Sequence, residues 1–272
     1  MTIAAGKPSM GELQEREHGV GHDYAKGSPH IRHHTVRDRL IGDLHALVHE
    51  VIDRNGQCRV VELGAGHGTF TDHLLAAGAQ ITVTEMSEPS AHLLRHRFQH
   101  NPNVTVIHDK DGTAACTAGP FDAVVCISVL HHIPDYLTTV KQLVENTVPG
   151  GAFFSAQDPL WYPRRSPLSL GLDRGAYFLW RLGQGHLRRG IATRLRRIRG
   201  VYDDMNEADM VEYHVVRNGV DEEALQGLLA PAFAKLEVQR YWSTQSGFMQ
   251  AVGERVCPPS TFSLVARERR SA

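Results

Sequence analysis

Two groups of residues in this sequence have types and spacings that could do chemistry. In the first, Gly64, Gly66 and Gly68 follow an apolar run from Val60 to Leu63. Such a run is typical of a buried parallel strand, and the glycines let the backbone turn sharply and come close to a ligand. Because Thr69 to Ala77 then has helical spacing, the loop is expected at the amino end of a helix. Unpaired amides and the helix dipole favour an anionic ligand group there.

The second group is the adjacent pair His131 and His132, which follows the apolar run from Phe121 to Ile127. An imidazole titrates near neutral pH, so a histidine beyond the end of a strand could take a proton from a hydroxyl or an amine. Adjacent side chains cannot both face one cavity. We predict that His131 is catalytic and faces a substrate, and that His132 makes structural hydrogen bonds. A structural role for His131 is the alternative.

The spacing of the glycines excludes two common nucleotide sites. A dinucleotide-binding loop has glycines at its first, third and sixth positions, but counting from Gly64 the sixth position is Thr69. A phosphate-binding P-loop needs a lysine before Ser or Thr, whereas this loop has Gly68 in that place. A nicotinamide-dependent reductase, which would need the first pattern, is therefore disfavoured.

What remains resembles motif I of the class I S-adenosylmethionine (SAM) dependent methyltransferases, Glu/Asp-x-Gly-x-Gly-x-Gly, which Glu62 and the three glycines match. The resemblance implies SAM as the cofactor, with its amino-acid carboxylate at the amino end of the helix. Glu85 ends the next apolar run, Ile81 to Thr84, at the family's usual distance from motif I. It would accept hydrogen bonds from the two ribose hydroxyls; the alternative is a polar residue that merely ends a strand.

The resemblance extends to further cofactor contacts. Asp109 would bind the adenine amino group, with Asp111 as a competing candidate, and Met86 would lie against the adenine face unless it is a core methionine. Tyr24 is similar to an N-terminal tyrosine that closes over the cofactor, although an ordinary amphipathic anchor is the alternative. The predicted cofactor-binding residues are therefore Tyr24, Glu62, Gly64, Ala65, Gly66, Glu85, Met86, Asp109 and, through the backbone facing the methionine portion, Ile127 and Ser128.

The elements that must position these residues alternate between strands and helices. Apolar runs at 60–63, 81–84, 104–107, 121–127 and 152–156 are separated by stretches of helical spacing, and two further runs lie at 236–241 and 261–266. Alternation of this kind predicts right-handed parallel crossovers and a doubly wound α/β sheet with its ligand crevice at the carboxyl ends of the strands. The resemblance implies seven strands, mostly parallel, with an antiparallel final strand.

Residues 160–217 interrupt this rhythm with aromatic residues, a basic stretch and an acidic stretch. We predict a helical lid insertion that helps to form the acceptor pocket, with Asp158, Trp161 and Tyr177 as substrate residues. A solvated helical hairpin with mutually paired charges is the alternative. Residues 1–27 are expected to form a flexible arm before a helix that starts at Ser28-Pro29, and residues 28–272 to form one domain. The arm or the insertion could link copies of the chain.

The composition narrows the function classes. A net charge of −1 argues against nucleic acid as the main partner, and no stretch approaches 18 apolar residues, which argues against an integral membrane segment. The four cysteines form no Cys-x-x-Cys pair and indicate reduced thiols in a cytoplasmic protein. Histidines share helical faces at 30, 33 and 34 and at 96 and 100, but without carboxylates at matching spacing we expect no metal site.

The sequence therefore predicts a SAM-dependent methyltransferase that acts on a small hydrophobic metabolite such as a secondary metabolite, a terpenoid or a quinone-like compound. Whether the methyl group goes to O, N or C stays open. The alternative is a SAM-fold binding protein or a cyclase that transfers no methyl group.

Overall fold

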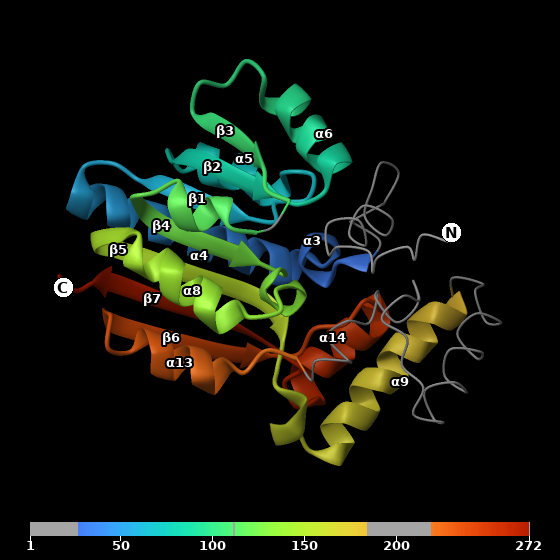
Figure 1. Ribbon diagram of the computed structural model, residues 1–272. Coiled ribbons are helices and arrows are strands. Elements are labelled where there is room, and N and C mark those ends of the chain that lie inside the picture. Colours follow the sequence, from blue (N-terminus) through green and yellow to red (C-terminus); the bar gives the residue numbers. More distant parts are fainter. Residues whose placement is uncertain (1–26, 111, 184–218, 272) are drawn as a thin grey trace, which may run out of the picture.

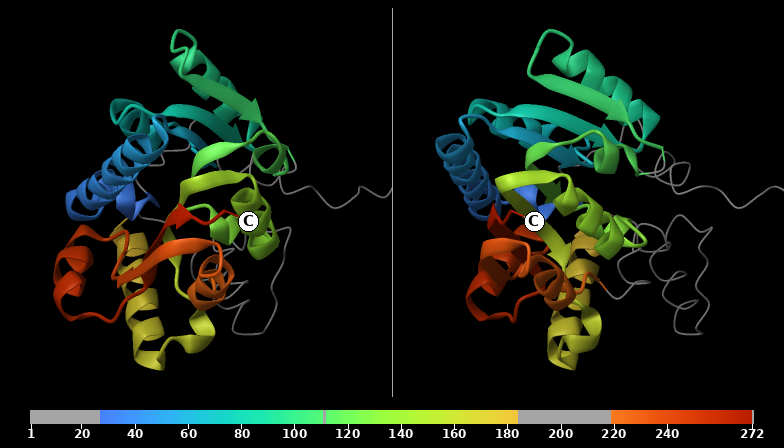
Figure 2. Two further views of the ribbon diagram at one scale, coloured as in Figure 1. Left: turned by 90° about the vertical axis from the view of Figure 1, so that its left-hand side faces the viewer. Right: turned by 60° about the vertical axis from the view of Figure 1, so that its left-hand side comes forward.

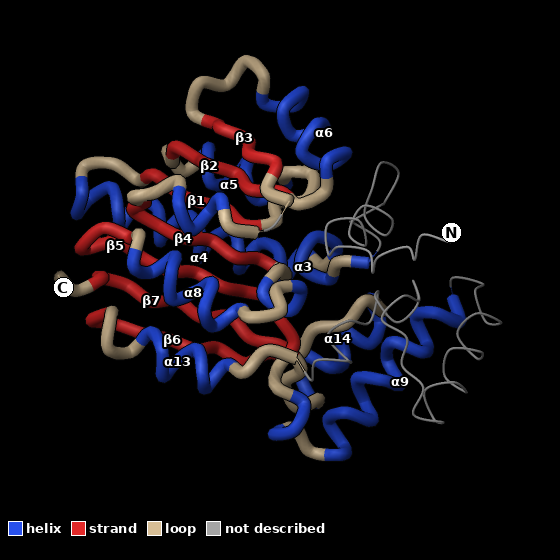
Figure 3. The backbone as a smooth tube through the Cα atoms, viewed as in Figure 1, coloured by secondary structure: helices blue, strands red, loops and turns tan. Residues whose placement is uncertain are grey.

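The computed structural model describes residues 27–110, 112–183 and 219–271. In this part of the chain seven strands form one sheet in the order β3-β2-β1-β4-β5-β7-β6 (Figures 1 and 3). The strands are β1 (Arg59–Leu63), β2 (Gln80–Glu85), β3 (Val104–His108), β4 (Phe121–Ile127), β5 (Thr147–Pro159), β6 (Phe233–Tyr241) and β7 (Thr261–Arg269). Adjacent strands from β3 to β5 are parallel, and β7 is antiparallel to both β5 and β6. The predicted mostly parallel sheet with one antiparallel final strand is confirmed.

Helices cover both faces of the sheet (Figure 2). One apolar core joins the sheet to α4 (His34–Asn55), α5 (Thr69–Ala76) and α6 (Glu88–Phe98), and a second joins it to α7 (Ala114–Thr117), α8 (Tyr136–Glu145) and α13 (Glu222–Leu229). The remaining elements are α3 (Pro29–Arg32), η1 (Leu130–His132), η2 (Tyr162–Arg164), α9 (Pro167–Gly183) and α14 (Gly247–Val256). With both faces covered, the cofactor loop and the histidine pair are left at the carboxyl edge of the parallel strands.

Local sequence signals account for several helix ends. Leu40, Leu44 and Leu47 form the buried stripe of α4, and the left-handed Gly56 ends that helix with φ = 78°. Asp221 caps α13 by accepting hydrogen bonds from the amides of Glu223 and Ala224. These ends therefore follow from residues within one turn of the helix.

The structure differs from the expected elements in two places. The helix expected from Ser28-Pro29 is divided, because His33 adopts an extended conformation between α3 and α4. Helix α14 is an additional element between the two last strands, and it packs so closely on Trp242 that a Cβ at Gly253 would come within 2.2 Å of the indole nitrogen.

Some expectations fall beyond the described residues. The described part of the insertion contains η2 and helix α9. Its charged stretches lie outside the part of the chain that the structure describes, as do Tyr24, Asp111 and nearly all of the N-terminal arm. No helix among the described residues is long and apolar enough to cross a bilayer, and no cluster of three His, Cys, Asp or Glu side chains with metal-binding proximity occurs among them. The four cysteines are free thiols.

Candidate active site

The glycine-rich loop leaves β1 through three left-handed glycines, which alternate with other residues. Gly64, Gly66 and Gly68 have φ values of 61°, 58° and 81°. A Cβ at Gly64 would lie 2.6 Å from Val129, and one at Gly68 would lie 2.9 Å from Leu94 and Phe98. The left-handed backbone favours glycine at all three positions, and at Gly64 and Gly68 an added Cβ would also displace a neighbouring side chain. The loop brings its backbone to the amino end of α5.

The carboxylate of Glu85 connects this loop to the end of β2. Its two oxygens accept hydrogen bonds from the amides of Gly66 and Ser87, both at 3.0 Å. Burial raises the pKa of Glu85, and the amide hydrogen bonds oppose that shift. Since each carboxylate oxygen has two lone pairs, the group keeps acceptor capacity for the hydroxyls of a ligand.

Glu62 lies inside β1, 3% exposed, and accepts a hydrogen bond from the hydroxyl of Thr71 at 2.6 Å. Burial raises its pKa to about 7. The side chain therefore ties the strand to α5 directly behind the loop. This position supports the loop from below.

Asp109 and Met86 occupy the neighbouring strand ends. The oxygens of Asp109 accept hydrogen bonds from the amides of Thr113 and Ala114 at 3.1 and 3.0 Å, which anchors the start of α7. Met86 is partly exposed, and its carbonyl lies 3.1 Å from the ring of His108. Both residues therefore lie on the same sheet edge as Glu85, and Asp109 also has a structural role that the sequence did not predict.

Beyond β4 the backbone turns through an uncommon conformation. Ser128 has φ = 55° although it is not glycine, and its amide donates to the carbonyl of Ala156 at 2.8 Å. Positive φ in such a residue is costly and gathers at functional sites. The turn leads from Ile127 into η1, which carries His131.

His131 is held by a buried carboxylate from the next strand. Its Nδ1 lies 2.7 Å from Oδ1 of Asp158, and its backbone amide donates to the same oxygen at 3.1 Å. Asp158 is fully buried and also accepts a hydrogen bond from Ser155. Because an ionised carboxylate only accepts, Nδ1 carries the proton of a neutral His131 and Nε2 is the basic nitrogen.

A cavity of about 270 Å³ lies beside this pair. Its wall is mostly apolar and is formed by Leu130, His131, Ile133, Pro134, Tyr136, Trp161 and Gly219. The structure thus brings together His131 and Trp161, which the sequence assigned to catalysis and to the substrate. Asp158 stands behind His131, whereas Tyr177 lies on α9 with its ring 5.7 Å from that of Trp180 and does not line this cavity.

His30 is a further functional candidate that the sequence analysis did not assign. It lies on α3, 6% exposed, and its ring stacks on Phe70 with centroids 5.7 Å apart. Its Nδ1 has no hydrogen-bond partner among the described residues. Burial, with a smaller contribution from the nearby His131, lowers the pKa of His30 to about 3. Only the packing of α3 against α5 could reveal this neutral imidazole beside the cofactor loop.

The comparisons with known proteins agree with this geometry. Residues 61–153 match the family described as a methyltransferase domain. That segment contains the glycine loop, Glu85 and the histidine turn. Over residues 61–153 the chain is therefore similar to methyltransferase domains.

The curated proteins similar to this chain include ubiquinone biosynthesis O-methyltransferases. The chain is 36% identical over 108 residues to a ubiquinone biosynthesis O-methyltransferase from Aromatoleum aromaticum, over 38% of this chain and 46% of that protein. It is 30% identical over 100 residues to the protein of that name from Vibrio parahaemolyticus, over 36% of this chain and 43% of that protein. The chain thus spans less than half the length of these curated relatives.

Solved structures share the fold over nearly the whole chain. The N-methyltransferase NodS from Bradyrhizobium japonicum, solved with S-adenosyl-L-homocysteine (SAH), is 17% identical and superimposes with a TM-score of 0.54 over 97% of this chain and all of that chain. The magnesium protoporphyrin IX methyltransferase from Synechocystis, also with bound SAH, is 18% identical with a TM-score of 0.50 over 94% and 92% of the two chains. At these low identities the two structures show that this chain shares their fold, and nothing further.

Proposed function

We propose that this chain transfers the methyl group of SAM to a hydroxyl group of a small, largely hydrophobic molecule. The observation that carries the proposal is the pair of His131 and Asp158 beside an apolar cavity, on the sheet edge that also holds the glycine loop and Glu85. A hydroxyl acceptor needs a base, and this edge provides one. The names of the curated relatives support oxygen as the acceptor atom.

The residues of the loop fit the cofactor. Glu85 would accept hydrogen bonds from the ribose hydroxyls, while the left-handed Gly64 and Gly66, on either side of Ala65, let the backbone come close to the cofactor. Asp109 and Met86 would contact the adenine, and the backbone of Ile127 and Ser128 would face the methionine portion. When bound, SAM supplies an electrophilic methyl group on a sulfonium.

The chain itself has two tasks in the transfer. The cavity beside Trp161 orients the acceptor and excludes water, which supplies proximity in an in-line displacement. His131 then takes the hydroxyl proton on Nε2 as the new O–CH₃ bond forms and the S–CH₃ bond breaks, leaving a neutral thioether. Asp158 keeps the proton on Nδ1 and stabilises the imidazolium that results.

Calorimetric titration with SAM and SAH tests the cofactor site directly. Mass spectrometry of a phenol and catechol panel incubated with SAM then tests transfer, with the gain of one CH₂ as the expected result. Binding of SAH without any methylated product across hydroxyl, amine and carbon acceptors would instead favour the binding protein or cyclase. Failure to bind either cofactor form would reject the proposal.

A further inference from the structure

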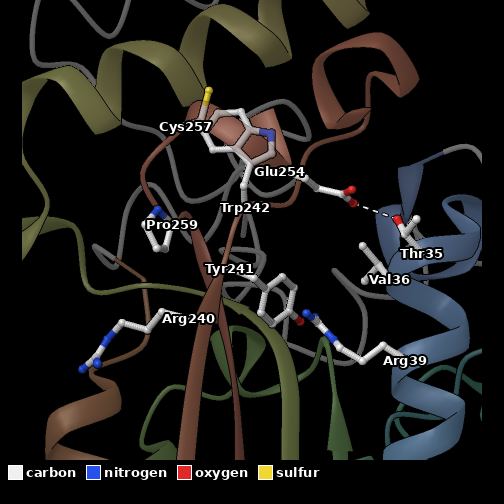
Figure 4. Close-up of a pocket in the computed structure, with 9 residues that line it drawn as sticks. All are labelled: Thr35, Val36, Arg39, Arg240, Tyr241, Trp242, Glu254, Cys257 and Pro259. Carbon is white, nitrogen blue, oxygen red and sulfur yellow. Dashed lines mark hydrogen bonds between the residues drawn. The ribbon is translucent and has the colours of Figure 1, made fainter. Parts of the chain in front are cut away.

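A second cavity, of about 370 Å³, lies between the first turns of α4, the end of β6 and helix α14 (Figure 4). It differs from the cavity beside His131, with which it shares no lining residue. Its volume lies in the range of pockets that hold small molecules. The chemical character of its wall comes mainly from Arg39, Arg240, Tyr241, Trp242, Glu254 and Pro259.

Arg39 reaches into this cavity from α4. Its guanidinium carbon lies 3.9 Å from the centre of the Tyr241 ring, so the cation lies over the aromatic ring. Nε and Nη2 are buried, and neither has a hydrogen-bond partner among the described residues. Leaving such donors unpaired is costly, most of all on a charged group.

The two unpaired nitrogens lie on one edge of the guanidinium. Nε–H and an N–H of Nη2 point in parallel, which matches the two oxygens of a carboxylate or phosphate. The platform behind them is rigid, because Tyr241 donates its hydroxyl to Gln157 at 3.2 Å and Gln157 in turn donates to Ser243 at 2.6 Å. Arg39 is therefore preorganised for a planar two-oxygen anion.

The neighbouring charges select among such anions. Glu254 lines the same cavity as a carboxylate, with hydrogen bonds from Thr35 and Gln250 at 2.7 and 2.8 Å. Arg240 points away from Arg39 and pairs with Glu222 at 3.2 Å, so it adds little positive charge (Figure 4). Glu254 would repel a dianion such as phosphate more strongly than a single carboxylate, so the charges favour a monoanion.

Pro259, which is exposed, gives the cavity an apolar surface, whereas Trp242 is only 3% exposed and contributes little. We propose that this cavity binds a small organic monocarboxylate, with the carboxylate on the Nε and Nη2 edge of Arg39 and its apolar body against Pro259. The ligand is either a carboxylate-bearing end of the acceptor or a separate molecule. The chemistry that recognises it is the same.

Benzoate is a suitable probe, and benzamide is its uncharged counterpart of nearly equal shape. Titrated into the full chain without cofactor, benzoate is expected to bind at least about tenfold more tightly than benzamide, the preference that one charge-assisted bidentate contact provides. Equal affinity for the two, or no binding of benzoate, would overturn the proposal. The measurement does not involve methyl transfer, so its failure and that of the proposed function are distinguishable.

Variants locate the site. Arg39→Met is expected to remove the preference for benzoate, and Arg39→Lys to reduce it, since an ammonium group keeps the charge but lacks the two-pronged edge. Arg37→Met is the matched control, because Arg37 is on the same helix but pairs with Asp38 outside the cavity. Unchanged benzoate binding in both folded Arg39 variants would contradict the assignment.

The thiol of Cys257 gives a second measurement, since it lines the cavity and is partly exposed. Bound benzoate is expected to slow alkylation of Cys257 but not of Cys116, a partly exposed thiol on α7. Equal slowing of both would place benzoate elsewhere and reject the site.

Methylation assays then show whether the carboxylate belongs to the acceptor or to a separate molecule. Each acceptor is tested as the acid and as its methyl ester. If the site holds an end of the acceptor, Arg39→Met raises KM for the acid alone. If the ligand is separate, benzoate binds without competing with the acceptor. Either result supports the site and names its occupant.

Discussion

The two halves of the candidate site satisfy their buried carboxylates in different ways. In the cofactor half, Glu62 binds Thr71 nine residues away, and Glu85 binds the amides of Ser87 and Gly66, two and nineteen residues away. In the acceptor half, Asp158 of β5 binds His131, which is twenty-seven residues away in η1, after strand β4. One half is built within a single strand-helix-strand unit, and the other is assembled across the sheet.

The difference shows which parts of the site can vary independently. A local unit keeps its shape as long as β1, α5 and β2 fold, so the cofactor loop depends on few distant contacts. The acceptor half depends on how η1, β5 and the first residues of the insertion meet. We therefore expect changes in the acceptor half to affect turnover, and changes in the cofactor half to affect binding and stability.

The largest expected effect is on turnover after His131→Ala. Loss of the proposed general base should lower kcat by about 10²- to 10⁴-fold, the usual contribution of such a group, while the affinity for SAH stays the same. Asp158→Asn should act in the same direction, because it no longer keeps the proton on Nδ1. Steady-state kinetics and calorimetry on the same samples measure kcat and the affinity for SAH separately.

His132→Ala is the matched control for this prediction, since the neighbouring imidazole has its ring centroid only 4.0 Å from that of His131. If His132→Ala loses kcat to a similar extent, the loss is not specific to His131. If His131→Ala also loses affinity for SAH, the acceptor half does not act on turnover alone, and the two halves are not distinct.

The next effect is on stability and concerns Glu62. Its pKa rises on folding from 4.5 to about 7, so between these values the folded chain binds more protons than the unfolded chain. Stability is then lost as the pH rises through this window, by about 3 kcal/mol if the full shift is realised. Glu62→Gln should lack this dependence, which urea unfolding at several pH values would measure.

The exposed Glu145, whose carboxylate pairs with Lys141 at 4.0 Å, provides the control variant Glu145→Gln. Each variant is compared with wild type in the pH dependence of its free energy of unfolding. If Glu62→Gln changes this dependence no more than Glu145→Gln does, Glu62 ionises in the folded chain without loss of stability.

The smallest effect is on cofactor affinity. Glu85→Gln keeps the size of the side chain but replaces the charged acceptor for the ribose hydroxyls, so the Kd for SAH should rise about tenfold. Glu88→Gln, three residues later on the exposed start of α6, should leave the Kd unchanged. Calorimetry that finds equal affinities in both variants would reject the ribose assignment.

Much of the fold was predictable because its signals are local. The glycines at 64, 66 and 68, the apolar runs of the strands and the cap at Asp221 each act within a few residues, and all of them correspond to the observed elements. The break at His33 was not predictable in this way, since the ring of His33 hydrogen-bonds the carbonyl of Thr244, 211 residues away. Helix α14 was likewise missed, and its seat on Trp242 is a tertiary contact.

The site divides along the same line. By itself the sequence determined the turn of small residues after β1 and the acidic end of β2, because strand, loop and helix follow one another and parallel crossovers have one hand. Only the tertiary structure decided that Asp158 stands behind His131, that His30 lies beside the cofactor loop, and that Arg39 lies over Tyr241 with two donors unpaired among the described residues. Those contacts join residues far apart in the chain, and no spacing within the sequence specifies which side chains will meet across a sheet.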